Sequence, residues 1–401
     1  MTQAGLRALR HREFRRLWIG FLLSSIGTWM QIVAQSWLVL RLSHGSAFAL
    51  GCVSLAQASA FFLFALIGGG LADRVDRRRL LIATQATLML VAATLGCLTA
   101  VGIITVPIIA AVAFVSGTVL SFDQPARAAL ISTLVPQEDL LNAISLQSAV
   151  FNGAAIVGPA LAGLIVNWIG LSADFFLNAL SFSGMLAALT LLPGRPRPAR
   201  AREKLLSQVR EALRSVHGDP VLVSALSTYG ILLFAGPSLQ LLLPVLALNR
   251  LHVGPATLGV LFSAAGVGAV LGALILGSLP AANTRFAQVA IACWCAALAI
   301  AGTGIEVWVT FCALILLGAS QSIVGATTSA LLQTRVSGEQ RGRVMSLNTL
   351  LLMGVRPLGD FPAGSLIAAI GAPFTAAVSA VVVAITSVVV YARFRGSGGR
   401  R

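Results

Sequence analysis

The chain has 401 residues, of which 57% are hydrophobic and only 10% are charged, and its mean hydropathy is +0.90. Because soluble domains carry about 25% charged residues, this composition excludes a water-soluble globular protein and predicts a chain that lies in a lipid bilayer. The net charge of +15 would suggest nucleic-acid binding in a soluble protein, but these basic residues fall in short segments between apolar runs, so we expect no nucleic-acid partner.

Twelve apolar runs follow one another along the chain, each near or above the roughly 20 residues that a helix needs to cross the hydrocarbon. They predict helices at 16–40, 46–72, 80–103, 105–126, 141–168, 173–193, 221–248, 256–279, 285–304, 307–331, 344–369 and 371–393. The sequence therefore indicates an all-α membrane protein with twelve transmembrane helices and both termini on one side.

Lys and Arg residues are distributed very unequally over the predicted loops. With a cytoplasmic N-terminus, 25 of the 28 fall on the cytoplasmic side, Arg41 and Arg250 fall outside, and Arg356 lies within a helix. Cytoplasmic loops of membrane proteins are enriched in these residues. We expect a multi-pass protein of the inner cell membrane, in contact with lipid, with both termini in the cytoplasm.

The longest polar segment, 195–219, falls near the middle of the chain. Its opening letters, RPRPARAREK, suit an extended linker. Apolar residues then recur at helical spacing and predict an amphipathic helix on the membrane surface; these are Leu205, Leu206, Val209, Leu213 and Val216. We predict an N-terminal six-helix bundle at 1–193, a cytoplasmic linker at 194–220 and a C-terminal six-helix bundle at 221–401.

The two predicted bundles repeat each other in sequence. An offset of 201 residues pairs several glycines, among them Gly163 with Gly364, and an offset of 208 pairs Gly51 with Gly259. Small residues let membrane helices approach closely. Parallel repeats with a binding site near the membrane midplane are the architecture of secondary transporters.

A dense charge run lies between the second and third predicted helices, in GGGLADRVDRRRLL from Gly68 to Leu81. It resembles the loop 2–3 signature of the major facilitator superfamily, with Asp76 in place of the signature's second glycine. The matching residues are Gly69, Asp73, Arg74, Arg77, Arg78 and Arg79. The resemblance implies two pseudo-symmetric bundles of six helices each.

Four further stretches are similar to one branch of that superfamily, the enterobactin-exporter-like or transmembrane secretion effector permeases. They read FDQPARAALISTLVPQEDLLNAISL, GPALAG, LLLPVLA and RGRVMSL. This resemblance implies an inner-membrane permease that is usually a proton-driven exporter. In GPALAG, residues Gly158, Pro159 and Gly163 are similar to an antiporter motif of the fifth helix, with Ala162 at one of its glycine positions. The fourth helix departs from many proton-coupled drug exporters, because its first Arg is Arg127, at the inner end.

Arg356 and Asp360 are the ionisable residues near the middle of a predicted span, in GVRPLGDFPAG. Ionisable groups at membrane depth are expensive and often functional, and an i, i+4 spacing lets the two side chains meet. One interpretation is a self-neutralising pair that stabilises packing. The other makes Asp360 a proton or cation site, with Arg356 tuning it or binding an anionic substrate group.

The first predicted helix carries a polar stripe at Ser24, Thr28, Gln31 and Gln35. A polar stripe in a membrane span faces protein or a water-filled cavity. We favour substrate lining by Gln31 and Gln35, and hydrogen bonding between helices is the alternative.

The acids beside loop 2–3 lack a topological explanation, because the positive-inside rule explains the arginines alone. We hypothesise an asymmetric inner gate. In this gate Asp73 faces the positive N-terminal end of helix 11, and Asp123, as the resemblance suggests, holds Arg77. Asp174 and Glu306 fall at predicted outer helix ends and are expected to be solvated.

These patterns favour a secondary-active exporter of a small amphipathic molecule, such as a drug, siderophore or metabolite, that works by alternating access. An importer or facilitator of the same fold is the alternative, and a non-transporting scaffold or sensor is a third. We expect no enzyme activity and no cofactor, because no phosphate-binding loop or catalytic constellation appears. The five cysteines show no metal-ligand spacing and are interpreted as small buried hydrophobic residues. A monomer is expected.

Overall fold

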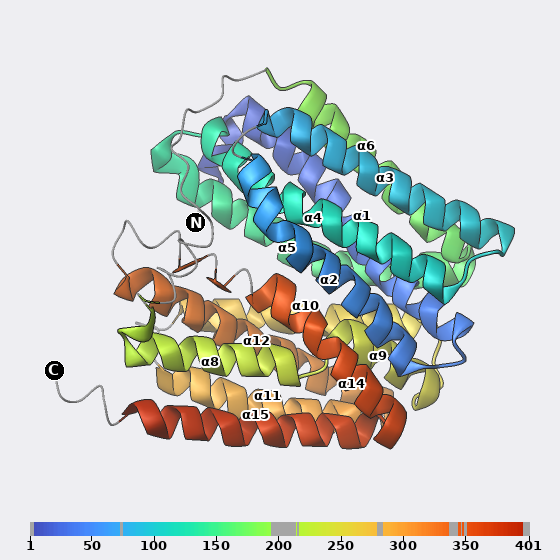
Figure 1. Ribbon diagram of the computed structural model, residues 1–401, viewed down its shortest axis with the longest axis vertical. Helices are drawn as coiled ribbons and strands as arrows, with labels where there is room; N and C mark the ends of the chain where they lie inside the picture. Colours follow the sequence, from blue (N-terminus) through green and yellow to red (C-terminus); the bar gives the residue numbers. More distant parts are fainter. Residues whose placement is uncertain are drawn as a thin grey trace. The chain divides into compact units, whose positions relative to one another are not determined.

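The computed structural model describes residues 4–72, 75–193, 214, 216–278, 284–336, 344–345, 347–348 and 351–395. Within these residues the chain is almost entirely helical (Figure 1). The long helices are α1 (Arg12–Leu42), α2 (Ala47–Ala72), α3 (Arg77–Val101), α4 (Val106–Leu134), α5 (Leu140–Trp168), α6 (Leu171–Thr190), α8 (Pro220–Ala235), α9 (Leu239–Asn249), α10 (Pro255–Gly277), α11 (Thr284–Thr303), α12 (Val307–Arg335), α14 (Arg356–Ile370) and α15 (Ala372–Arg395). Short helical turns are η1 (Ala4–Arg10), η2 (Gln137–Asp139) and the π-turn η3 (Leu351–Val355).

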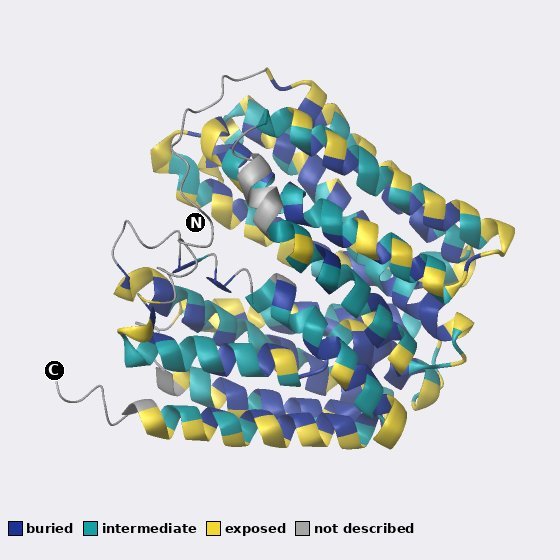
Figure 2. Ribbon diagram, viewed as in Figure 1, coloured by how far each residue is buried: buried dark blue, intermediate teal, exposed yellow. Residues whose placement is uncertain are grey.

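The described residues contain 11 helical stretches that are long and apolar enough to cross a membrane. The predicted eleventh helix, 344–369, is not one of them, because the longest helix within its described part is the 15-residue α14, which follows the π-turn η3. The all-α, multi-pass membrane class is confirmed. Large apolar side chains stay exposed along α15, where Val381, Ile385 and Val388 are more than half exposed (Figure 2). Such a face suits contact with lipid tails.

Contacts divide the chain into two compact units. Unit 1 comprises Met1–Leu42, Ser59–Ala201 and Gly254–Ser263, and unit 2 comprises Ser43–Ala58, Arg202–Val253 and Ala264–Arg401. The first half of α2 therefore belongs to unit 2, and the start of α10 belongs to unit 1. Most of the predicted linker, with its amphipathic helix, lies outside the described residues.

In unit 1, α6 packs along both α1 and α3, and α5 packs along α1 (Figure 1). Glycines let the α1 and α6 backbones approach, since a Cβ added at Gly20 would lie 2.9 Å from the carbonyl oxygen of Gly184. The apolar core near the start of α1 is built on Phe14 and Leu17, both at most 2% exposed. This packing fixes the face that α1 turns toward α6.

In unit 2, α11 lies between α12 and α15, and α8 packs against α15. The helix predicted at 221–248 is broken into α8 and α9 at Gly236, Pro237 and Ser238. Proline has no backbone N–H and disfavours helical dihedrals in the residue before it. Ser238 starts α9, and its hydroxyl accepts a hydrogen bond from the N–H of Leu241 at 3.2 Å. The prediction of a continuous helix was therefore wrong at this position.

The close α1–α6 approach gives a stability test. Gly20→Val places a branched side chain against the backbone of α6, so we expect the melting temperature in detergent to fall, at a cost of about 1–3 kcal/mol. Gly153→Val is the matched control, because a Cβ at Gly153 meets no atom within 4 Å. Equal melting temperatures for the two variants would contradict the packing described here.

Candidate transport site

An acidic side chain is buried at the break between α8 and α9. Asp360 of α14 is 3% exposed. Its carboxylate accepts a hydrogen bond from the backbone N–H of Ser238 at 2.9 Å and another from the Ser238 hydroxyl at 2.8 Å. The side chain of Ser54 on α2 also hydrogen-bonds to this carboxyl group. Three segments distant in sequence thus meet at one carboxyl group.

The position of this carboxyl group has an electrostatic reason. Ser238 is the N-cap of α9, and the first turn of a helix presents unpaired N–H groups and a partial positive charge. Discontinuous helices in transporters use such half-helix termini at their binding sites. An acidic side chain from another helix therefore accepts the hydrogen bonds that Ser238 offers at the α8–α9 break.

Arg356 lies one turn before Asp360 and interacts with it electrostatically. It also interacts with Tyr229 of α8. Among the described residues, no ion pair within 4.0 Å joins Arg356 to Asp360. The two side chains are neighbours, as the i, i+4 spacing predicts, but the direct partners of Asp360 are the two serines.

The predicted polar stripe of α1 divides into two parts. Gln31 accepts a hydrogen bond from the Asn178 amide of α6 at 2.6 Å and donates to Gln35 at 3.4 Å. Ser24 and Thr28 bond to backbone carbonyl groups of their own helix. At Gln31 the structure shows the alternative interpretation, hydrogen bonding between helices. Gln31 and Gln35 are both only half-buried, so a role in substrate lining stays a prediction.

The loop 2–3 motif is described in part. Asp73 and Arg74 lie outside the described residues, and Gly69 lies within α2. Arg78 donates to the carbonyl oxygens of Leu189 and Thr190, each at 2.7 Å. These carbonyl groups end α6, where cations stabilise the negative end of the helix dipole. Arg78 therefore ties the start of α3 to the end of α6.

Asp76, which replaces a glycine of the family signature, has a local role. Its side chain accepts hydrogen bonds from the backbone N–H groups of Arg78 and Arg79 at 2.9 and 3.4 Å. Asp76 is thus the N-cap of α3. Asp at this position is among the preferred capping residues.

Asp123 has a different cationic partner from the one predicted. Its carboxylate pairs with Arg127, one turn along α4, and accepts hydrogen bonds from Thr84 at 2.8 Å and Gln85 at 2.7 Å. Arg77 instead donates to the carbonyl oxygen of Ala129 at 3.0 Å. The predicted Asp123–Arg77 pair is wrong, because an i, i+4 partner on the same helix reaches the carboxylate first.

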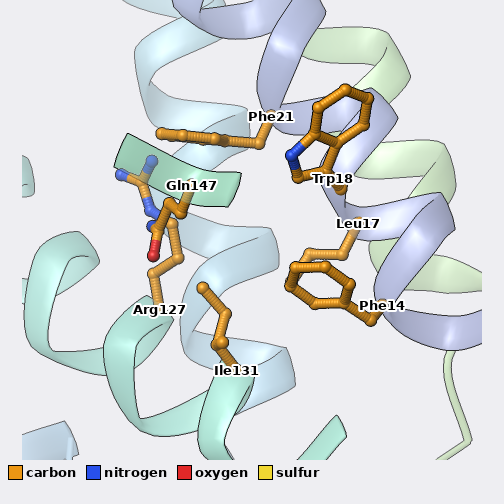
Figure 3. A pocket seen from close by; sticks show the side chains of 7 residues that line it. All are labelled: Phe14, Leu17, Trp18, Phe21, Arg127, Ile131 and Gln147. Atoms are coloured by element: carbon orange, nitrogen blue, oxygen red, sulfur yellow. The ribbon is translucent and has the colours of Figure 1, made fainter. Parts of the chain in front are cut away.

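Arg127 also lines a small pocket in unit 1 (Figure 3). Its guanidinium group lies 4.7 Å from the ring centre of Phe21, a cation–π distance. The other side chains that line the pocket come from α1, α4 and α5: Phe14, Leu17, Trp18, Ile131 and Gln147. The space measures about 10 Å³, about enough for one water molecule. It is too small for a solute in this state.

The glycine–proline motif of α5 lies at close helix contacts. A Cβ added at Gly158 would lie 2.6 Å from the Cβ of Trp29, and one at Gly163 would lie 2.6 Å from the carbonyl oxygen of Pro255 in α10. The carbonyl oxygen of Pro159 lies against Gly259 of α10. These contacts define the α5–α10 crossing, at which Gly163 and Gly259 meet.

A matching crossing lies in unit 2, where α2 meets α14. A Cβ at Gly51 would lie 3.0 Å from the Asp360 carbonyl oxygen, and one at Gly364 would lie 3.3 Å from the Gly51 Cα. This α2–α14 crossing uses Gly51 and Gly364, which the repeat offsets pair with Gly259 and Gly163. The internal repeat thus places equivalent glycines at both crossings.

Asp174 departs from its prediction. It is 0% exposed, and neither carboxylate oxygen has a hydrogen-bond partner among the described residues. The expectation that it is solvated was wrong, because the first turn of α6 is covered by its neighbours. Glu306, in contrast, is exposed before α12. The cysteines were also only partly predicted, since Cys295 is buried whereas Cys97 and Cys312 are exposed.

Comparison with known proteins agrees with this architecture. Residues 3–396 match the family described as transmembrane secretion effector. The chain is 27% identical to the enterobactin exporter EntS of Citrobacter koseri, over 92% of this chain and 88% of that protein. It is 24% identical to the staphyloferrin A transporter of Staphylococcus aureus, over 84% of each chain.

Solved structures show the same fold. A bacterial homologue of the human lysosomal transporter Spinster, inward-facing and occupied, matches with a TM-score of 0.75 and 14% identity, over 98% of this chain and 97% of that one. A bacterial homologue of the iron transporter ferroportin matches with a TM-score of 0.73 and 16% identity, over 96% and 98%.

The ion pair of the buried Asp123 with the partly buried Arg127 predicts strong coupling between the two side chains. Arg127→Gln leaves the carboxylate buried without its cation and should lower the free energy of unfolding by about 3 kcal/mol, whereas Asp123→Asn should cost less, because the Arg127 guanidinium group is partly exposed. The double variant should lose clearly less than the sum of the two single losses. Additive losses, measured in mixed micelles, would show that the two charges do not depend on each other.

Asp174 gives a contrasting prediction. Because neither oxygen accepts a hydrogen bond from a described residue, a neutral side chain of the same size should avoid the cost of burying an unpaired charge. Asp174→Asn is expected to keep or raise the melting temperature. Asn178→Ala, which removes the hydrogen bond to Gln31, should lower it. A drop for Asp174→Asn as large as that for Asn178→Ala would refute this view.

Proposed function

Since this chain belongs to the transmembrane secretion effector family of the major facilitator superfamily, and is therefore a membrane transporter, we propose that it exports a small amphipathic molecule by alternating access. The relatives named as an enterobactin exporter and a staphyloferrin A transporter support a siderophore-like substrate class. The bacterial exporter relative supports a location in the inner membrane, and the protein is proposed to work there as a monomer. The strong excess of Lys and Arg in one set of loops supports cytoplasmic termini.

The proposed transporter consists of two six-helix bundles, at 1–193 and 221–401, joined by the linker at 194–220. The glycines that repeat between the bundles support this division. In such an architecture the bundles rock around a central site. Gln31 and Gln35 of α1 are proposed to contact the substrate, because they are half-buried and polar within an otherwise apolar span.

The observation that carries the mechanism is the buried carboxyl group of Asp360. An intramembrane acid is a functional candidate by default. We propose that Asp360 takes up and releases the proton that drives export, with Arg356 as the neighbouring cation that offsets its charge. Its carboxylate accepts hydrogen bonds from the hydroxyl and the backbone N–H of Ser238, at 2.8 and 2.9 Å. A proton can therefore neutralise Asp360 without first breaking a direct ion pair.

The proposed inner gate at loop 2–3 differs from the one predicted from the sequence in the role of Asp123. Asp73 and Arg74 remain proposed gate residues on the strength of the family resemblance. Arg77 and Arg78 are proposed to hold the inner ends of α4 and α6 to the loop, through the carbonyl contacts described above. Asp123 is proposed to stabilise α4 through Arg127 and is no longer assigned as the partner of Arg77.

Asp360→Asn tests the proton role. In proteoliposomes with an imposed pH gradient, we expect this variant to lose at least about 90% of gradient-driven export, because Asn cannot carry the proton. Substrate binding should persist. Enterobactin and staphyloferrin A are the first substrates to measure, followed by a panel of amphipathic dyes and drugs.

Glu306→Gln is the matched control, because Glu306 is an exposed acid whose side chain makes no capping hydrogen bond. It should keep gradient-driven export. Full export by Asp360→Asn with an unchanged response to the gradient would eliminate the coupling role. Gradient-driven accumulation in the opposite direction would instead favour an importer.

A further inference from the structure

The two glycine crossings are alike in backbone contact but differ in polar contact. At the α5–α10 crossing, the Ser263 hydroxyl donates to the carbonyl oxygen of Ile156 at 2.6 Å. This is a side-chain-to-backbone bond between neutral groups. At the α2–α14 crossing, the bonded group is the carboxyl of Asp360. The repeat offset of 201 pairs Asp360 with Pro159, which carries no charge.

The Asp360 carboxyl group joins all the helices of its crossing. It belongs to α14, accepts both hydrogen bonds of Ser238 at the start of α9, and hydrogen-bonds to Ser54 of α2. The rings of Phe48 on α2 and Phe361 on α14 pack against each other, with centroids 5.8 Å apart. The backbone of Gly51 touches the backbone of Asp360 itself. A change of charge at Asp360 therefore acts directly on the contact between α2 and α14.

We propose that Asp360, Ser238 and Ser54 form a latch that holds the α2–α14 crossing closed while the carboxylate is charged, and that proton binding to Asp360 releases it. The proposal rests on the proposed function, because it takes Asp360 as the proton-coupling group. Ser54 and Ser238 are positioning residues in it. Hydrogen bonds to a charged acceptor are about twice as strong as those between neutral groups, so neutralisation weakens each contact.

Among the described charged and titratable side chains around the latch, Asp360 is the acid. On its own helix it faces Arg356. Of the helices packed nearby, α8 contributes Tyr229, the described side chains of α2 contribute Cys52, and α9 contributes none. Tyr391 and Arg393 of α15 lie at the end of that helix far from its junction with α14. Proton binding thus changes the balance between one carboxylate and one guanidinium group.

The latch has a consequence for both crossings. Each crossing joins a helix of the first sequence half to a helix of the second: α2 to α14, and α5 to α10. Separation of the two halves in alternating access must open both. Release of the latch should therefore expose buried residues at both crossings. Local loosening of α2 should expose buried residues at the α2–α14 crossing alone.

The test measures labelling of a single buried cysteine by a membrane-impermeant maleimide, in a variant without the native cysteines. The reporters are Ala47→Cys on α2, 3% exposed in the native chain, and Ala162→Cys on α5, 0% exposed. Labelling is measured on intact cells and on inside-out vesicles, in neutral and acidic buffer. Each rate is divided by that of the same cysteine in detergent-unfolded protein at the same pH.

With the latch intact, acidic buffer should raise the normalised labelling rate at both reporters. Ser54→Ala and Asp360→Asn should raise it in neutral buffer by about threefold to tenfold, the effect of losing one or more hydrogen bonds. Asp360→Asn should also abolish the response to acid. Ser238→Ala should act in the same direction, although it removes the cap of α9 as well. Ser365→Ala is the matched control on α14, because the bond of its hydroxyl among the described residues is to its own helix, at the carbonyl oxygen of Phe361.

Two results would overturn the latch. One is labelling of Ser54→Ala and Asp360→Asn at the rate of Ser365→Ala. The other is an increase in the labelling rate of Ala47→Cys without an increase in that of Ala162→Cys. The outcome is separate from that of the export assay: loss of export in Asp360→Asn with unchanged labelling refutes the latch alone. A labelling response without gradient-driven export refutes proton-driven export and leaves the latch standing.

Discussion

A helix that breaks inside a membrane must find new partners for the backbone groups that the break releases, because lipid tails offer none. The break between α8 and α9 meets this constraint with the carboxyl group of Asp360, which accepts from both the backbone and the side chain of Ser238. Since Asp360 belongs to α14 and also contacts Ser54, the break fixes three helices at one point. The acid at this point thus supports the fold, and it is the group to which the proposed mechanism assigns the proton.

The two buried acids with described partners have different surroundings. Asp123 pairs with Arg127 and accepts two further hydrogen bonds, so its charge is compensated within α3 and α4. Asp360 has neutral donors as its direct partners and a guanidinium group one turn away. Protonating Asp123 would break a direct ion pair, whereas protonating Asp360 weakens hydrogen bonds between helices. This difference favours a structural role for Asp123 and a mechanistic role for Asp360.

Much of the architecture was predictable because it depends on local composition. Apolar runs of membrane length gave the spans, and paired glycines such as Gly51 and Gly259 indicated the contacts that the crossings use. Asp360 stood out because an acid in an apolar run is costly wherever the run packs. The break at Pro237 was missed because the flanking residues are uniformly apolar, although Gly-Pro-Ser is a recognisable signal for a helix end and a new cap.

The partners of individual charged side chains were predicted less well than the spans. Family resemblance assigned Asp123 to Arg77, but the i, i+4 spacing to Arg127 was the stronger local signal. The burial of Asp174 depends on how its neighbours cover α6, which a single sequence does not reveal. The capping role of Asp76 was predictable from the local sequence, because an acid directly before a helix is a capping signal. It was missed because Asp76 was considered only as a departure from the glycine of the family signature.

The repeat also shows how equivalent contacts can acquire different functions. Glycines at equivalent positions allow the same close approach at both crossings, and that approach depends on shape alone. A carboxyl group at one crossing adds a contact whose strength depends on its charge, whereas Pro159 at the equivalent position adds none. In the proposed mechanism the two six-helix bundles separate as rigid bodies, so one such contact is enough, because a bias at one crossing acts on both. In that mechanism, asymmetry in charge within a symmetric set of backbone contacts is what couples proton binding to the movement of both bundles.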